Sequence, residues 1–237
     1  MLNTFVAVDI ETTGLSPIKD KIIEIGALKV IDGTVIEKFD QLINPLIPIK
    51  DQISSLTGIT DELVTNAPDI TKVLKDFLEF AGDLPILGHN ILFDYSFLKV
   101  NFMNLDISYE RKGMDTLKLS RILHSDLNSK SLSSMCKYYG IYNEHAHRAF
   151  DDAKAAYELY CELIKAFYQQ VPKYFVEESL IYKVRKREPI TKRQKNYLID
   201  LAKYHRIELK QPVDNMSKSE ASRFIDKIIL SYGRILR

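Results

Sequence analysis

The sequence predicts an α/β domain in which helices flank a mixed sheet. Apolar runs rich in β-branched residues, which indicate strands, come first in the chain. Segments with helical periodicity follow, and one further short apolar run lies among them. Asp32-Gly33 lies between two of the apolar runs and is typical of a hairpin turn. The expected strands are Phe5 to Ile10, Lys21 to Ile31, Thr34 to Ile43 and Pro85 to Leu87.

Helices are expected where apolar residues recur every three or four positions. Residues 44–68, which contain several prolines, are expected to form loop and short helical turns. After them the expected helices run from Asp69 to Phe80, from Gly88-His89-Asn90 to about Phe102, from Thr116 to Leu123, from Leu132 to Tyr139 and from Ala149 to Tyr168.

The C-terminal quarter differs from the rest of the chain in charge. The 237 residues include 33 Lys and Arg and 32 Asp and Glu, a formal net charge of +1. Residues 1–182 carry 18 basic and 26 acidic side chains, whereas residues 183–237 carry 15 and 6. This step from −8 to +9 predicts two units with different roles. We expect a large domain over 1–170, a basic linker over 171–189 and a small helical domain over 190–237.

Two helix starts define the small domain. Thr191 can cap a helix that carries Leu198 and Leu201, and Ser217 with Glu220 forms a capping box before a second apolar stripe. A unit of about fifty residues rarely stabilises itself alone, so we expect it to dock on the large domain, to dimerise or to fold with a partner. If the basic run beginning at Lys183 holds a nucleic-acid backbone, binding should weaken steeply with salt.

Composition excludes several classes of protein. Hydrophobic residues at 46% and charged residues at 27% are inconsistent with disordered or fibrous chains. Cys136 and Cys161 share no C-x-x-C spacing, so they support neither a disulfide framework nor a zinc site. The N-terminus lacks a basic signal region, and no stretch approaches the ~18 apolar residues of a membrane span. We therefore expect a cytoplasmic protein without a membrane partner.

The first chemical cluster lies on the first expected strand. Asp9 and Glu11 are two residues apart, so both carboxylates project from the same side of the sheet. Two acids on one face of a buried strand need a cation or hydrogen-bond donors, which favours Mg²⁺ or Mn²⁺. D-x-E alone arises by chance about once in 250 residues. The neighbouring residues strengthen the case for a metal site, because Thr12-Thr13-Gly14 follows as a turn whose backbone can approach a ligand.

A second cluster follows the fourth expected strand. In His89-Asn90-Ile91-Leu92-Phe93-Asp94 the carboxylate of Asp94 falls in the first turns of a helix, near the sheet edge. The alternative is that Asn90 caps the helix and Asp94 is a solvated acid.

A third cluster precedes the last long helix of the large domain. His147 lies on the loop that leads into this helix, and Asp152 lies at its start. A loop imidazole with a near-neutral pKa suits proton abstraction. Alternatively, Asp151 and Asp152 only satisfy the positive end of the helix. Together the clusters supply four carboxylates and one histidine, the side chains of a two-metal phosphoryl-transfer site.

The order and spacing of these clusters resemble the three motifs of the DEDDh 3′–5′ exonucleases, which belong to the ribonuclease H-like superfamily. The likeness covers about residues 3–168 and is strongest to the proofreading exonuclease of bacterial replicative polymerases. It rests on the ordered set Asp9-x-Glu11-Thr12-Thr13-Gly14, His89-Asn90-x-x-Phe93-Asp94 and His147-x-Ala149-x-x-Asp152. The resemblance implies a ribonuclease H-like mixed sheet of five strands flanked by helices.

The resemblance also implies the roles of individual residues. Asp9, Glu11, Asp94 and Asp152 would bind two Mg²⁺ or Mn²⁺ ions, and His147 would deprotonate the attacking water. His145, although close to it in sequence, lacks the family's spacing. Asp115 is expected to be a helix cap. Around the terminal nucleotide, the resemblance assigns contacts with sugar, phosphate and bases to Thr12, Thr13, Gly14, Leu15, His89, Asn90 and Phe93.

The expected activity is release of nucleoside 5′-monophosphates from 3′ ends of single-stranded DNA, with a DNA polymerase or another replication or repair protein as partner. One alternative keeps the enzyme but makes RNA or short oligonucleotides the substrate, because contacts to the sugar 2′ position cannot be seen in a sequence. The other is a catalytically silent nucleic-acid or polymerase-binding module. No catalytic residue is missing, which favours the enzyme.

Overall fold

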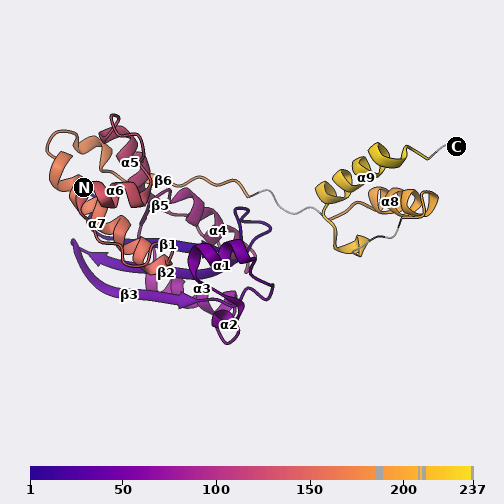
Figure 1. Cartoon of the computed structure of the whole chain (residues 1–237), viewed down its shortest axis with the longest axis horizontal. Helices are drawn as coiled ribbons and strands as arrows, with labels where there is room; N and C mark the ends of the chain where they lie inside the picture. The colour runs from indigo at the N-terminus through magenta and orange to yellow at the C-terminus, as the bar shows by residue number, and fades with distance from the viewer. Residues whose placement is uncertain (185–188, 208, 210–211, 236–237) are drawn as a thin grey trace. The chain divides into compact units, whose positions relative to one another are not determined.

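A computed structural model of the chain describes residues 1–184, 189–207, 209 and 212–235. The chain divides into two compact units, Met1–Tyr182 and Lys183–Arg237 (Figure 1). Within the described residues, no helix has both the length and the apolar character needed to cross a membrane.

The first unit is built on a six-stranded mixed sheet in the order β3-β2-β1-β4-β5-β6. The central strand β1 pairs antiparallel with β2 and parallel with β4. The strands are β1 Phe5–Thr12, β2 Ile22–Ile31, β3 Thr34–Leu42, β4 Ile86–Gly88, β5 Lys112–Asp115 and β6 Glu178–Ser179. The α/β class and the ribonuclease H-like arrangement are confirmed.

The expected number of five strands was one too low. The extra strand β6 has two residues, too few for any periodic pattern, and it exists only through its antiparallel pairing with β5. Phe175, just before it, is wholly buried in the first unit. Residues 171–182, expected to be part of the linker, are therefore part of the large unit.

Helices cover both faces of the sheet. One face of the sheet is covered by α3 and α4, and the other by α5, α6 and α7. The described helices of this unit are α1 Asp51–Thr57, α2 Asp61–Val64, α3 Ile70–Ala81, α4 Leu92–Met103, α5 Thr116–Leu123, α6 Leu132–Tyr139 and α7 Ala149–Phe167, with a 3₁₀ turn over Pro172–Tyr174.

Alternation along β1 decides where its acids point. Val6 and Val8 pack on the α3 and α4 side, whereas Phe5 and Ala7 pack on the α7 side. Asp9 and Glu11 continue the second set, because side chains two residues apart share a face of a strand. Both carboxylates therefore face the layer that contains α7.

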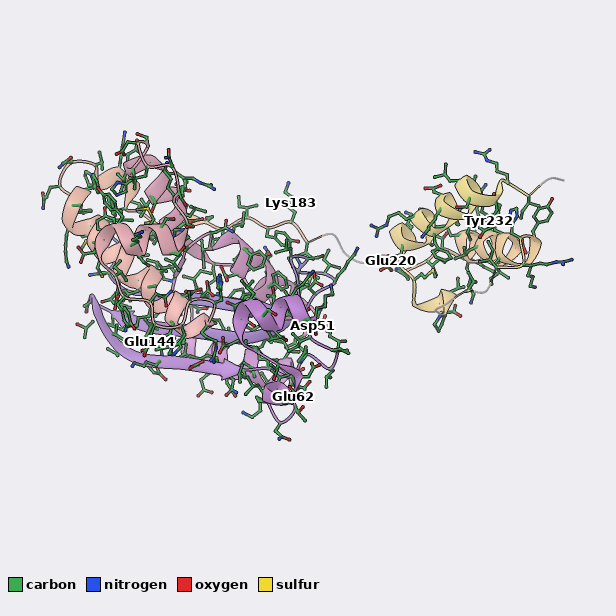
Figure 2. The ribbon with its side chains drawn as sticks, viewed as in Figure 1. Asp51, Glu62, Glu144, Lys183, Glu220 and Tyr232 are labelled. Atoms are coloured by element: carbon green, nitrogen blue, oxygen red, sulfur yellow. The ribbon has the colours of Figure 1, made fainter. Side chains whose placement is uncertain are left out.

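The second unit contains helices α8 Lys192–Tyr204 and α9 Lys218–Tyr232 and a 3₁₀ turn over Val213–Asn215. Both helices begin at the predicted caps, Thr191 and Ser217, and a capping box is present at each, although it was predicted only at Ser217. They begin at the same end of the unit, where Pro189 bridges to Ser217 and the Gln194 side chain donates to the Lys218 carbonyl at 2.9 Å. Figure 2 shows Glu220 and Tyr232 toward opposite ends of α9. The small core comprises Leu198, Leu201, Met216, Ile225 and Ile228. Of the basic run, residues 185–187 lie outside the described residues.

Candidate active site

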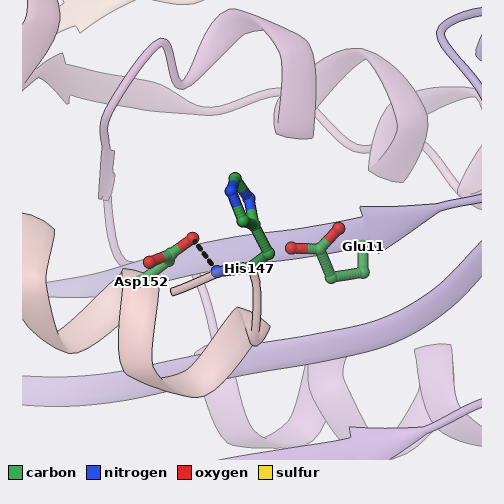
Figure 3. A group of neighbouring side chains, drawn as sticks. All are labelled: Glu11, His147 and Asp152. Carbon is green, nitrogen blue, oxygen red and sulfur yellow. Dashed lines mark hydrogen bonds between the residues drawn. The ribbon is translucent and has the colours of Figure 1, made fainter. Parts of the chain in front are cut away.

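Three predicted residues meet at the end of β1 (Figure 3). Glu11 belongs to β1, His147 to the loop before α7, and Asp152 to the first turn of α7. One potential ligand atom from each lies within 4.8 Å of the other two. The two carboxylates are half-buried and the imidazole is exposed, so an entering ligand can reach the group.

Asp9 and Asp94 lie outside that three-residue group but close enough to interact electrostatically with it. Burial, followed by repulsion from Asp94, Asp152 and Glu11, raises the pKa of Asp9 well above its usual range. The Asp94 carboxylate is 3% exposed and accepts a hydrogen bond from the Ile10 amide at 3.1 Å. This burial excludes the alternative that Asp94 is a solvated acid.

The carboxylates destabilise one another's charged forms. Burial and the neighbouring negative charges raise the pKa of Glu11 to about 8, and burial is the main cause that raises the pKa of Asp94 to about 8. Burial also raises the pKa of Asp152. Oxygen ligands that repel one another in this way are suited to a hard divalent cation, whose charge would offset theirs. The residues present therefore fit the expected Mg²⁺ or Mn²⁺.

Two hydrogen bonds to Asp152 fix the loop that carries His147. The backbone N–H of His147 donates to Asp152 Oδ2 at 3.1 Å, and the Asn143 side chain donates to Oδ1 at 2.6 Å. His147 itself has a φ of 68°, a left-handed conformation that is uncommon outside glycine. Asn143 was not predicted, because nothing in its irregular segment marks it as a partner of Asp152.

A second unpredicted feature is the ion pair of Glu24 with Arg148. Glu24 lies opposite Glu11 in the β1–β2 pairing and is wholly buried. Its carboxylate accepts from Arg148 Nε at 3.0 and 3.2 Å and from the Ala149 N–H at 2.9 Å. Arg148 directly follows His147, so β2 holds the start of α7 beside the site. A lone acid inside the apolar run of β2 was the signal that could have indicated it.

Gly26 allows the close approach of α7 to the sheet. It pairs with Asp9 across the two strands. A Cβ atom at this position would lie 2.0 Å from the Phe150 nitrogen and 2.2 Å from the Ala149 carbonyl carbon. Only glycine leaves room for the helix start that presents Asp152 next to β1.

The turn after β1 contains the first predicted substrate contacts. The Thr12 hydroxyl donates to the Gly14 carbonyl at 2.7 Å, and the Thr13 hydroxyl accepts from the Lys21 N–H at 2.9 Å. A Cβ at Gly14 would lie 2.6 Å from the Asp20 carboxylate. Leu15 is 86% exposed, so this apolar side chain is available to a ligand.

The second predicted cluster is held by groups at the end of β5 and in the segment that follows it. Both ring nitrogens of His89 have protein partners, the Thr116 hydroxyl at 2.9 Å and the Lys130 carbonyl at 2.8 Å. Asn90 does not cap α4; its backbone N–H donates to Asp115 at 3.0 Å. Asp115 also accepts from two N–H groups of α5, which confirms it as a helix cap. Phe93 is half-buried and packs on Phe97, with ring centroids 5.0 Å apart.

His145 takes no part in the group around Glu11. Its Nδ1 lies 3.1 Å from Asp151 Oδ2. Of the two histidines in this loop, the structure therefore brings only His147 to the carboxylates.

Comparison with known proteins identifies the family. The family model described as exonuclease, of the RNase T type, matches residues 6–160. DNA polymerase III PolC-type of Caldanaerobacter subterraneus subsp. tengcongensis is 43% identical over 161 residues, 68% of this chain and 12% of the relative. The Bacillus subtilis protein of the same name is 40% identical over 164 residues, 68% of this chain and 11% of the relative. The chain thus spans about an eighth of the length of these relatives.

Solved structures share the fold. Exonuclease X in complex with 5′ overhanging duplex DNA has a TM-score of 0.56 at 24% identity, covering 69% of this chain and 92% of its own. E. coli Exonuclease I in complex with a dT13 oligonucleotide has a TM-score of 0.64 at 21% identity, covering 73% and 43%. The chain belongs to the exonuclease family.

Proposed function

We propose that the protein removes nucleoside 5′-monophosphates from the 3′ end of single-stranded DNA, with two Mg²⁺ or Mn²⁺ ions as cofactors. The observation that carries the proposal is the convergence of Glu11, Asp152 and His147 within 4.8 Å, with Asp9 and Asp94 alongside. DNA is favoured because relatives that are 43% and 40% identical to this chain are DNA polymerases.

Each side chain has a distinct task in this proposal. Asp9, Glu11, Asp94 and Asp152 would hold the ions. Bound divalent ions supply charge stabilisation for the attacking and leaving oxygens of a phosphoryl group. His147, exposed at the rim, would accept the proton of the attacking water and carry it to solvent.

Residues around the acids would bind the last nucleotides. Thr12, Thr13 and Gly14 form a closed turn whose backbone can contact sugar and phosphate. Exposed Leu15 would pack on the terminal bases, and His89, Asn90 and Phe93 would shape the pocket from the α4 side. We propose a DNA polymerase or another replication or repair protein as partner; a cytoplasmic location stays a prediction.

Digestion of 5′-labelled substrates tests this function. Single-stranded DNA, recessed and mismatched duplexes and RNA would each be incubated with Mg²⁺, Mn²⁺ or chelator. We expect ladders that shorten from the 3′ end of DNA with either metal, and intact substrate with chelator. Cleavage in chelator would contradict the metal-dependent mechanism, and cleavage of RNA alone would change the substrate. Protein carrying Asp9→Ala, purified in parallel, reports contaminating nuclease.

A further inference from the structure

An exposed group of aromatic rings lies where α8 and α9 end. The rings of Tyr204 and His205 have centroids 4.9 Å apart, and those of His205 and Tyr232 are 5.7 Å apart. His205 is held in place by its Nε2, which lies 3.0 Å from the Gly233 carbonyl. Tyr204 is 50% exposed and Tyr232 is 60% exposed, so both rings offer open surface to a ligand.

Basic side chains flank these rings. Lys203 and Arg206 bracket Tyr204 and His205 in sequence, and Arg234 follows Tyr232 by two residues; all three are exposed. None of the three forms an ion pair with another residue in the described part of the chain. We call the six residues Lys203, Tyr204, His205, Arg206, Tyr232 and Arg234 the aromatic–basic end.

Folding of the unit does not account for this composition. The two tyrosines lie outside the small apolar core around Leu198 and Ile225. Cations near helix C-termini are favoured by the helix dipole, which explains the basic residues but not the exposed rings beside them. Rings next to cations that have no ion-pair partner among the described residues match a ligand with flat apolar faces and repeated negative charges.

We propose that the aromatic–basic end binds single-stranded nucleic acid, with bases stacked on Tyr204 and Tyr232 and phosphates on Lys203, Arg206 and Arg234. Stacking on aromatic side chains beside a positive surface is how proteins bind single strands without reading sequence. The net charge of +9 over residues 183–237 complements a polyanion. The inference rests on the proposed function only for the presence of a nucleic-acid substrate.

The proposed binding surface lies at the end of the unit opposite residues 189 and 190. Residues 189 and 190 join the unit beside the helix starts, through the Pro189–Ser217 bridge and the bond from the Ile190 N–H to Met216. The 13 residues of α8 place its other end about 20 Å away.

Fluorescence anisotropy tests the proposal. It would measure how the full-length protein binds a fluorescent oligothymidylate of about 20 nucleotides in the presence of chelator. Tyr204→Ala with Tyr232→Ala should raise Kd by about five-fold or more. Tyr204→Phe with Tyr232→Phe should keep near-native affinity, because the rings remain. Neutralising Lys203, Arg206 and Arg234 with Gln should flatten the plot of log Kd against log salt by about 0.7 per lost phosphate contact.

The matched control removes the same charge at the other end of the helices, through Lys192→Gln, Arg193→Gln and Arg223→Gln, and should change affinity much less. Unchanged Kd in the double-Ala variant, or equal losses in the two triple-Gln variants, would overturn the proposal and leave a protein-docking role for the unit. Cleavage of a labelled trinucleotide, which has too few nucleotides to fill both the active site and the aromatic–basic end, should be unaffected. If neither the wild type nor any variant cleaves the trinucleotide, the proposed function fails. The anisotropy measurement still tests the binding proposal independently.

Discussion

Arg148 places its guanidinium on the fully buried carboxylate of Glu24, with Nε 3.0 Å from Oε1. Because Arg148 directly follows His147 and immediately precedes α7, this ion pair joins β2 to the loop that bears the expected base. Glu24 also accepts from the Ala149 N–H, so two consecutive residues are fastened to one carboxylate.

Arg148→Met should therefore lower both stability and activity. Removing one partner of a buried ion pair leaves an unpaired charge and typically lowers the free energy of unfolding by about 3–5 kcal/mol. Because the Arg148 side chain is 39% exposed, we expect a loss near the lower end of this range. A shift of about 1 Å in a catalytic group can reduce a rate about 100-fold, so kcat should fall more than KM rises. Urea unfolding and steady-state kinetics measure the two effects.

The double variant Glu24→Gln with Arg148→Met separates charge from position. It should recover most of the lost stability, because the amide is neutral and still accepts from Ala149, but it should not recover kcat. Lys154→Met serves as the control, since Lys154 pairs only at 3.8 Å with Glu158 on the surface of the same helix. Wild-type kcat in Arg148→Met would contradict a positioning role.

Gly26→Ala should destabilise the protein by about 3 kcal/mol or more, which is the upper end of the usual cost of overpacking a core. The cost is high because the new Cβ would meet backbone atoms of Phe150 and Ala149, which cannot rotate away. Gly33→Ala provides the comparison: its Cβ would enter open space, and its φ of 78° imposes only the left-handed strain of about 1–2 kcal/mol. Equal losses in urea unfolding would mean that α7 does not require the close approach.

Asp9→Ala and Asp152→Ala should give folded but inactive exonucleases. His147→Ala should lose about 10²–10⁴-fold in rate, the range for a general base. His145→Ala, which removes the imidazole paired with Asp151, is the control and should keep the rate near wild type. Near-normal degradation of single-stranded DNA by any of the first three variants would contradict the site assignment.

The stability of the metal-free protein should fall as pH rises from about 4 to about 8. The pKa of Glu11 and of Asp94 is about 8 in the folded state and about 4 in an unfolded chain. Between these values the folded state binds more protons than the unfolded state, so the free energy of unfolding decreases with pH. Thermal unfolding in chelator should show a Tm several degrees lower at pH 8 than at pH 5.

Added Mg²⁺ or Mn²⁺ should raise Tm more at pH 8 than at pH 5, because the ion replaces protons on the same oxygens. Asp94→Asn, whose side chain cannot ionise, should weaken the pH dependence in chelator. A flat Tm profile that metal does not alter would rule out the mutual repulsion of these acids.

The sequence predicted most helices closely because their ends depend on local chemistry. The helices α5 and α6 span the predicted residues, with side-chain caps from Asp115 and Ser131. By contrast, β5 has the sequence Lys-Gly-Met-Asp, which lacks strand periodicity and becomes a strand only between β4 and β6. Pairings of distant residues, such as Glu24 with Arg148, leave no periodic mark in a single sequence.

The five proposed catalytic positions come from a spacing that matches a family pattern, and the alternation of β1 places two of them on the α7 face. The supporting contacts were not predictable. Asn143 reaches Asp152 from an irregular segment nine residues earlier, and the two bonds of His89 depend on where α5 and residue 130 lie in space.

Asp152 uses both carboxylate oxygens to close the loop before α7, one on Asn143 and one on the His147 N–H. One carboxylate oxygen of Asp152 also belongs to the group that can hold a cation. Cation binding and ordering of this loop are therefore thermodynamically linked. By reciprocity, each changes the equilibrium constant of the other by the same factor.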